Sequence, residues 1–152
     1  MTTHTELEPT RAGKLGHVLI ASGLPRQTVR LRRGDLLFQE GEPCAGVYVV
    51  ISGELELFVT PPRGEGVRVR TAGPEHVIGL VSAMNHAPYS KTARAVEPGV
   101  LERFGAHEVV EFLHASPDRW IDALSFLCDD ADAMQRLLAE AKGAKPRATA
   151  KR

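Results

Sequence analysis

The chain has 152 residues, which suits one domain that can bury a core without covalent cross-links. Its 19 basic and 19 acidic residues cancel, so no overall electrostatic field draws nucleic acid or a membrane surface. No run reaches the roughly 18 apolar residues of a spanning helix, and the polar start lacks the apolar segment of a signal peptide. We therefore expect a cytoplasmic protein with no membrane contact.

The first residues predict a disordered terminus at 1–8 and a short helix over 9–22, where two glycines weaken the helical pattern. The character then changes, because short apolar or alternating runs recur between Gly, Pro and Asp turn signals. The runs that predict strands are 28–32, 36–39, 46–51, 54–59, 67–72, 76–81 and 100–104. Many short strands at this spacing indicate a mainly β fold, a sandwich, barrel or roll, with flanking helices.

The pattern becomes helical after Phe104, with a short helix expected over 106–114. Ser116 and Pro117 predict the start of a long helix, because serine accepts a backbone N–H at a cap and proline suits the first helical position. This helix should run over 117–142 and stop at Gly143. The small, basic residues 143–152 predict a disordered tail.

The long helix carries apolar residues spaced alternately by four and three, the pattern of a coiled-coil seam. The seam consists of Trp120, Leu124, Leu127, Ala131, Met134 and Leu138. It predicts a homodimer formed through this helix. The alternative is that one face of the helix packs on the β domain and nothing more, and both can hold along different turns.

Two segments, 34–42 and 47–55, place Gly34, Gly41 and Gly53 where tight antiparallel strands must reverse, and only glycine adopts a positive φ cheaply. With their aliphatic strands in register, they resemble the opening β-roll of cyclic-nucleotide-binding domains of the CRP/FNR family. The resemblance covers about residues 10–142. It implies an antiparallel β-roll or jelly roll, a double-stranded β-helix, with a short N-terminal helix, a small helix and a long C-terminal helix.

The resemblance also locates a phosphate-binding cassette at residues 79–92. In the family, its glutamate accepts from the ribose hydroxyl and its arginine holds the cyclic phosphate. Here Leu80 stands in place of the glutamate and Tyr89 in place of the arginine, whereas Gly79, Pro88 and Thr92 match. The implied, degenerate ligand site consists of Gly79, Leu80, Val81, Ser82, Pro88, Tyr89, Ser90, Lys91 and Thr92.

Loss of both charged contacts would weaken cyclic nucleotide binding by two to four decades, at roughly 1.5–3 kcal/mol for each contact. We therefore expect weak or absent binding of cyclic AMP and cyclic GMP. Lys91 or Arg94 would have to supply a substitute positive charge for the site to be rescued. We expect the pocket to be lined by residues 78–92 and by strand positions near Tyr48 to Glu56.

The sequence thus predicts a non-enzymatic regulatory sensor domain with no cofactor, since no nucleophile, P-loop or dinucleotide motif is present. One alternative is a ligand-free interaction module with an unidentified protein partner. Another is a sensor of haem or a different small ligand, with His76 and His86 flanking the cassette. No histidine pair has metal-ligand spacing, and Cys44 and Cys128 are expected to be reduced thiols. The few residues after the long helix predict no direct sequence-specific DNA binding.

Overall fold

The structure is a computed structural model, and it describes residues 11–143. The disordered termini expected at 1–8 and 143–152 lie outside the described residues, apart from Gly143, which ends the last helix. In chain order the elements are α1 (Arg11–Ile20), β1 (Arg26–Leu31), β2 (Leu36–Phe38), β3 (Val47–Ser52), β4 (Leu55–Val59), β5 (Val67–Ala72), β6 (Val77–Ile78), α2 (Leu80–Asn85), β7 (Thr92–Ala95), β8 (Gly99–Phe104), α3 (Ala106–His114) and α4 (Pro117–Gly143).

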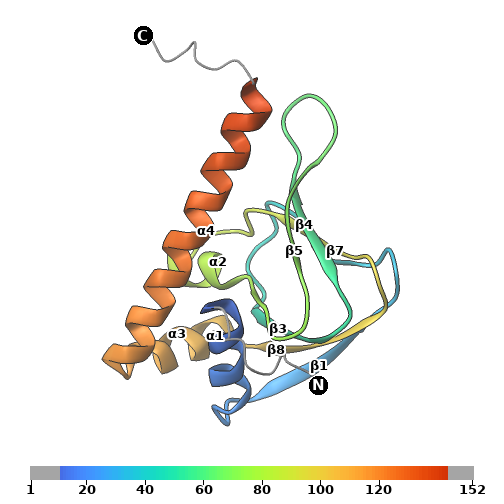
Figure 1. Ribbon diagram of the computed structural model, residues 1–152. Coiled ribbons are helices and arrows are strands. Elements are labelled where there is room, and N and C mark those ends of the chain that lie inside the picture. Colours follow the sequence, from blue (N-terminus) through green and yellow to red (C-terminus); the bar gives the residue numbers. More distant parts are fainter. Residues whose placement is uncertain (1–10, 144–152) are drawn as a thin grey trace, which may run out of the picture.

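The strands form two antiparallel, four-stranded sheets, with strand orders β1-β8-β3-β6 and β2-β7-β4-β5. Apart from the consecutive strands β4 and β5, neighbours in each sheet come from distant parts of the chain, as in the pairing of β1 with β8 and of β4 with β7. Figure 1 shows α4 running along one side of the strands, with α1 and α3 near its first turns and α2 between α4 and the sheets. The β-roll with flanking helices that the sequence predicts is confirmed.

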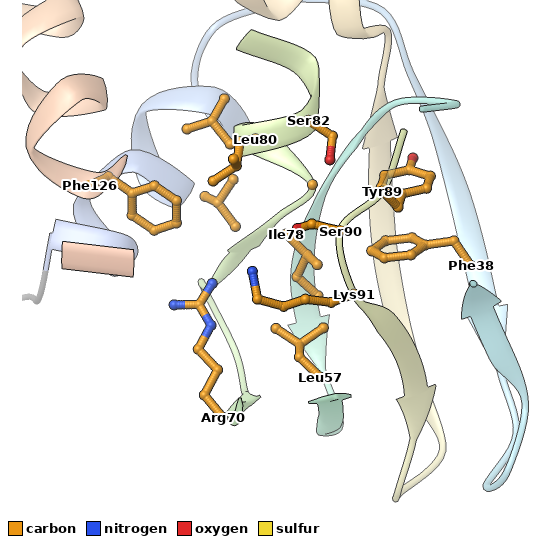
Figure 2. Close-up of a pocket in the computed structure, with 13 residues that line it drawn as sticks. Phe38, Leu57, Arg70, Ile78, Leu80, Ser82, Tyr89, Ser90, Lys91 and Phe126 are labelled. Atoms are coloured by element: carbon orange, nitrogen blue, oxygen red, sulfur yellow. The ribbon is translucent and has the colours of Figure 1, made fainter. Parts of the chain in front are cut away.

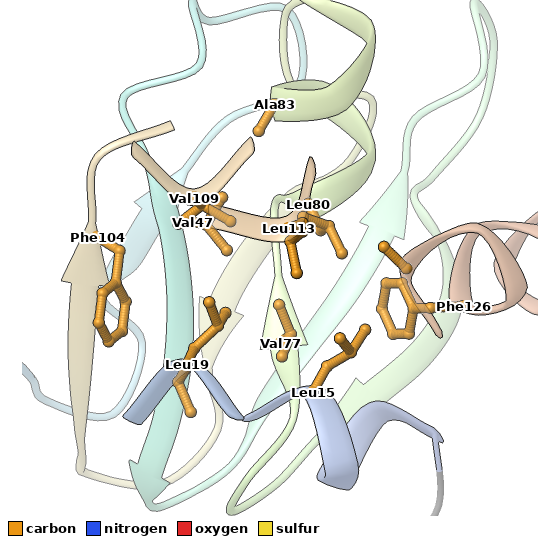
Figure 3. Close-up of a cluster of buried hydrophobic side chains, with 12 residues drawn as sticks. Leu15, Leu19, Val47, Val77, Leu80, Ala83, Phe104, Val109, Leu113 and Phe126 are labelled. Atoms are coloured by element: carbon orange, nitrogen blue, oxygen red, sulfur yellow. The ribbon is translucent and has the colours of Figure 1, made fainter. Parts of the chain in front are cut away.

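Two hydrophobic clusters share β3 as their common wall. Val47 and Val49 face a cluster built with the helices, whereas Tyr48 and Val50 face a cluster between the two sheets. Both faces of β3 are therefore buried, which explains why its sequence is a continuous apolar run and does not alternate. Figure 3 shows the first cluster, in which Leu15 of α1, Leu113 of α3 and Phe126 of α4 meet the strands.

The three glycines expected at strand reversals all have positive φ, at 91° for Gly34, 93° for Gly41 and 89° for Gly53. Gly53 is also constrained by space, because a Cβ there would lie 2.5 Å from the Pro98 carbonyl oxygen. The turn between β3 and β4 consequently admits no side chain at position 53.

The apolar run at 76–81, expected as a strand, is a strand only at Val77–Ile78. Gly79 has a φ of 89° and turns the chain into α2, so the same run crosses from strand to helix. The run is continuously hydrophobic because both the strand and the following helix are buried. For segments this short, hydrophobic periodicity does not distinguish a buried strand from a buried helix.

Helix α4 begins where the sequence predicts. Ser116 caps it, since its carbonyl accepts from the Trp120 amide at 2.9 Å and its hydroxyl accepts from the Arg119 amide at 3.5 Å. None of the helices within the described residues is long and apolar enough to cross a membrane.

Candidate functional site

A small cavity lies where β6 turns into α2, between the strands and α4 (Figure 2). Its volume is about 30 Å3, whereas pockets for drug-sized ligands measure ~300–1,000 Å3. The lining residues come from β2, β4, β5, β6, α2, the loop before β7, and α4: Phe38, Leu57, Arg70, Val77, Ile78, Gly79, Leu80, Val81, Ser82, Tyr89, Ser90, Lys91 and Phe126.

Seven of the nine predicted cassette residues line this cavity, and Pro88 and Thr92 do not. Pro88 borders a separate groove on the outer side of α2, and its carbonyl accepts from the Ser82 hydroxyl at 3.0 Å. The Thr92 hydroxyl accepts from the amide of Glu40, in the loop after β2, at 3.0 Å. Tyr48 to Glu56 do not line this cavity, although the adjacent Leu57 does, and the other strand contributions come from Phe38, Arg70 and β6.

Gly79 allows the cassette to approach β3 closely. A Cβ on it would lie 3.0 Å from the Gly46 carbonyl oxygen and 3.2 Å from the Tyr89 ring, in a backbone conformation that side chains rarely adopt. The cassette glycine therefore matters for packing as well as for the turn into α2.

Tyr89 is buried, and its hydroxyl is used by the backbone before β3. The hydroxyl donates to the Gly46 carbonyl at 2.8 Å and accepts from the Ala45 and Gly46 amides at 2.9 and 3.0 Å. The ring stacks on Phe38, with centroids 3.7 Å apart. Burial, with a smaller contribution from Tyr48, raises the pKa of Tyr89 far above its usual range. Tyr89 thus does more than fill the space of the family's arginine, because it fastens the loop between β2 and β3.

Leu80 is 1% exposed and belongs to the helix-side cluster shown in Figure 3. It packs there with residues such as Leu113 of α3 and Phe126 of α4. Leu80, which the resemblance places at the family's ribose-binding glutamate, is therefore part of the hydrophobic core and also lines the cavity.

Two cationic side chains reach the cavity. Lys91 is 8% exposed, and Figure 2 shows its ammonium group and the Arg70 guanidinium directed into the same space. The guanidinium of Arg70 also lies 5.7 Å from the ring centroid of Phe126 on α4. Arg94 lies elsewhere: its Nε and Nη2 donate to the Glu56 carboxylate at 3.0 and 2.5 Å. Of the two substitutes considered from the sequence, Lys91 is the one in the cavity.

Sequence reasoning missed Arg70, and a β-bulge is the reason. The pairing of β4 with β5 places Leu57 opposite Arg70 and Phe58 opposite Arg68, so Val69 has no partner in the register. Simple alternation would leave Arg70 outside with Arg68. The extra residue instead gives Arg70 the inward face that Leu57 shares.

The histidines and cysteines have local roles where the structure describes them. His76 Nδ1 accepts from the Gly73 amide at 3.1 Å within a turn, and the Cys44 Sγ lies 3.7 Å from the Gly46 carbonyl. Among residues 11–143, no three His, Cys, Asp or Glu side chains gather as a metal site.

The predicted seam of α4 divides between two environments. Trp120 and Leu127 pack against the helix-side cluster, whereas Leu124 is 43% exposed and Ala131 is exposed. The structure does not describe the side chains of Met134 and Leu138, so their place in the seam stays a prediction. Fully buried contacts come from Ala123 and Phe126, which the seam did not include.

Comparisons with known proteins agree with this geometry. The profile of the family described as "Cyclic nucleotide-binding domain" matches residues 28–116. An uncharacterised ABC transporter ATP-binding protein of Mycobacterium tuberculosis is 35% identical over 71 residues, which are 47% of this chain and 22% of that protein. The chain thus spans about a fifth of the length of this curated relative.

Two solved structures are similar to the chain in fold and in sequence. The N-terminal domain of a transcriptional regulator from Streptomyces coelicolor is 26% identical, with a TM-score of 0.55 over 94% of this chain and 92% of that one. The sensor domain of the transcriptional regulator DNR from Pseudomonas aeruginosa is also 26% identical, with a TM-score of 0.57 over 78% and 75% of the two chains. With the family's profile covering more than half of the sequence and the β-roll in place, the chain belongs to the cyclic nucleotide-binding domain family.

Proposed function

We propose that the chain is a non-enzymatic regulatory sensor domain of the CRP/FNR type, in which a change in the cavity alters how α4 packs on the rest of the domain. The observation that carries this proposal is the position of Phe126. This residue of α4 lines the cavity and also packs in the core cluster with Leu80 of α2. A change in the cavity would therefore alter the seating of α4, a small shift of packed helices of the kind used by switches.

The cassette itself supports weak or absent binding of cyclic AMP and cyclic GMP. The hydroxyl of Tyr89 is committed to backbone groups, and Leu80 offers no acceptor to a ribose hydroxyl. A cavity of about 30 Å3 also lacks room for a nucleoside unless α2 or α4 moves. Opening it would separate Leu80 from Phe126 and expose apolar surface, which adds a cost to any nucleotide complex.

Isothermal titration of the purified chain with each cyclic nucleotide tests this part of the proposal. We expect no measurable heat at concentrations that saturate ordinary members of the family. Circular dichroism on the same sample establishes that the protein is folded. Dissociation constants at or below micromolar for either nucleotide would overturn the degenerate-cassette interpretation.

A ligand-free interaction module is the second candidate, and the small cavity volume with its fully bonded Tyr89 favours it. In that case the roll is a scaffold and α4 is the contact surface. Both candidates include a homodimer through α4, and a cytoplasmic location stays a prediction from the sequence. A ligand that raises the melting temperature would favour the sensor over the scaffold.

A further inference from the structure

Strand β1 forms one border of the roll and has a strand neighbour on one side. It pairs with β8 along its whole length, and no other strand of residues 11–143 pairs with it (Figure 1). Val29 and Leu31 pack inward against the cluster between the two sheets. An edge strand presents unpaired backbone N–H and C=O groups, so the other side of β1 is open to a further strand.

Four arginines follow this open edge. Arg26 and Arg30 are on the face of β1 opposite Val29, because side chains alternate along a strand. Arg32 and Arg33 come directly after the strand. All four are exposed, and none has a carboxylate partner among the described residues. The chain as a whole has no net charge, so this positive region, the β1 arginine surface, is a local feature.

The charge and the open edge together select the occupant. A second copy of the chain is disfavoured, because pairing two β1 edges would bring arginines together, and like charges across a strand pair are destabilising. We infer that β1 binds an extended acidic peptide segment of a partner protein, which adds to the roll as a further strand. Directly opposite side chains in paired strands share a face, so two acidic residues four positions apart would face Arg26 and Arg30, which are about 13 Å apart.

Glu102 narrows the sequence of this segment. It lies on β8, one strand inward, and its carboxylate accepts from the Thr28 hydroxyl at 3.2 Å. Thr28 is midway between the two strand arginines, so this negative charge repels an acidic side chain placed opposite Thr28. The segment should therefore carry acids at its first and fifth positions and a neutral residue at the third. None of these residues lines the cavity, so this inference and the proposed function can fail separately.

Fluorescence anisotropy with the full chain and a labelled peptide containing Glu-Val-Thr-Val-Glu is the test. Binding is expected, and it should weaken as the salt concentration rises, because the contacts are exposed. A peptide with glutamine at both acidic positions is the control for charge. A peptide with methylated backbone amides is the control for strand pairing, since it keeps the charges and loses backbone donors. Both control peptides should bind more weakly than the acidic peptide.

Arg30→Gln is the main variant, because Arg26 also donates to the Ile20 carbonyl at 2.7 Å and its loss would disturb the fold. We expect Arg30→Gln to weaken peptide binding by roughly twofold to fivefold, as for one exposed ion pair. Glu102→Gln should strengthen binding. Arg68→Gln is the matched control, since Arg68 is an exposed arginine on β5 of the other sheet, and its binding should equal that of the parent chain.

Three results would overturn the inference. The first is a folded parent chain that does not bind the acidic peptide. The second is an equal loss of binding in Arg30→Gln and Arg68→Gln. The third is undiminished binding of the methylated peptide, or of a single-stranded oligonucleotide that depends equally on Arg30, because the surface would then attract any polyanion without strand pairing.

Discussion

Tyr89 connects the cassette to the rest of the roll through one hydroxyl. Its bonds to the backbone of Ala45 and Gly46 hold the chain just before β3, and the stacked Phe38 ring holds it from β2. Ionising this hydroxyl would remove its donated hydrogen and place a charge in a buried site. The raised pKa of Tyr89 expresses that cost, with burial as its main cause.

This gives a prediction for alkaline stability. In the unfolded chain tyrosine loses its proton near pH 10, whereas folded Tyr89 keeps its proton to higher pH. The stabilisation is therefore complete below about pH 10 and is lost as the pH rises above it, at roughly 1.4 kcal/mol per pH unit for each retained proton. Urea unfolding at several pH values, from neutral to strongly alkaline, measures how steeply the free energy of unfolding falls with pH.

Tyr89→Phe should remove its share of this alkaline slope and lower stability at neutral pH by about 1–3 kcal/mol, since the Gly46 carbonyl and two amides lose their partner. The chain has two tyrosines, and burial also raises the pKa of Tyr48, so a slope from Tyr48 should persist. Tyr48→Phe is the matched comparison. An alkaline slope that is identical in the parent chain and in Tyr89→Phe would contradict the assignment.

For single residues, the sequence shows which side chains depart from the family's motif, but it does not show which way a side chain points in the fold. Leu80 and Tyr89 are readable as departures because they sit at fixed places in a motif. The inward turn of Arg70 depends on a bulge at Val69, which leaves no mark in the alternation of β5. Phe126 reaches the cavity through a long-range contact of α4, and its position is outside the apolar seam that the spacing suggests.

Among the elements, α1 shows how packing overrides helix propensity. Gly16 is buried in the middle of this helix, and a Cβ there would lie 2.0 Å from the Glu75 carbonyl oxygen in the loop between β5 and β6. The glycine that weakens the helical pattern in the sequence is thus what lets α1 rest on the roll. Most strand positions, by contrast, follow from apolar runs and turn residues, with ends close to the expected ranges, but β7 (Thr92–Ala95) matches no expected strand.

Gly16→Ala should therefore destabilise the protein, although alanine is the better helix former by about 1 kcal/mol. Overpacking of this kind typically costs ~1–3 kcal/mol, because α1 or the loop has to move. The matched control is Gly73→Ala in the same loop, where a Cβ would meet nothing within 4 Å. We expect the control to stay within ~0.5 kcal/mol of the parent chain in urea unfolding. A gain of stability in Gly16→Ala would show that α1 does not need this close approach.

For the whole molecule, we expect the outer face of α4 to determine the assembly. Ala123 and Phe126 hold the helix to its own domain, and Ile121 and Leu124 remain 58% and 43% exposed. Cys128 and Ala131 are exposed too, and these four positions follow one another at spacings of three, four and three. The free apolar stripe is therefore displaced by about one residue from part of the seam that the sequence suggests, because Trp120 and Leu127 are partly used inside the domain.

If two copies pair through this stripe, Leu124→Glu should place like charges across the contact and convert a dimer into a monomer. Leu36→Glu is the control, since Leu36 has the same 43% exposure but lies on β2, away from α4. Sedimentation equilibrium over a range of concentrations gives the dissociation constant of each variant. A parallel pairing in register also brings the two Cys128 side chains near each other, so mild oxidation of such a dimer should yield a covalent dimer that Cys128→Ser prevents. A parent chain that sediments as a monomer would refute the homodimer, whereas a Leu36→Glu variant as disrupted as Leu124→Glu would move the assembly surface away from α4.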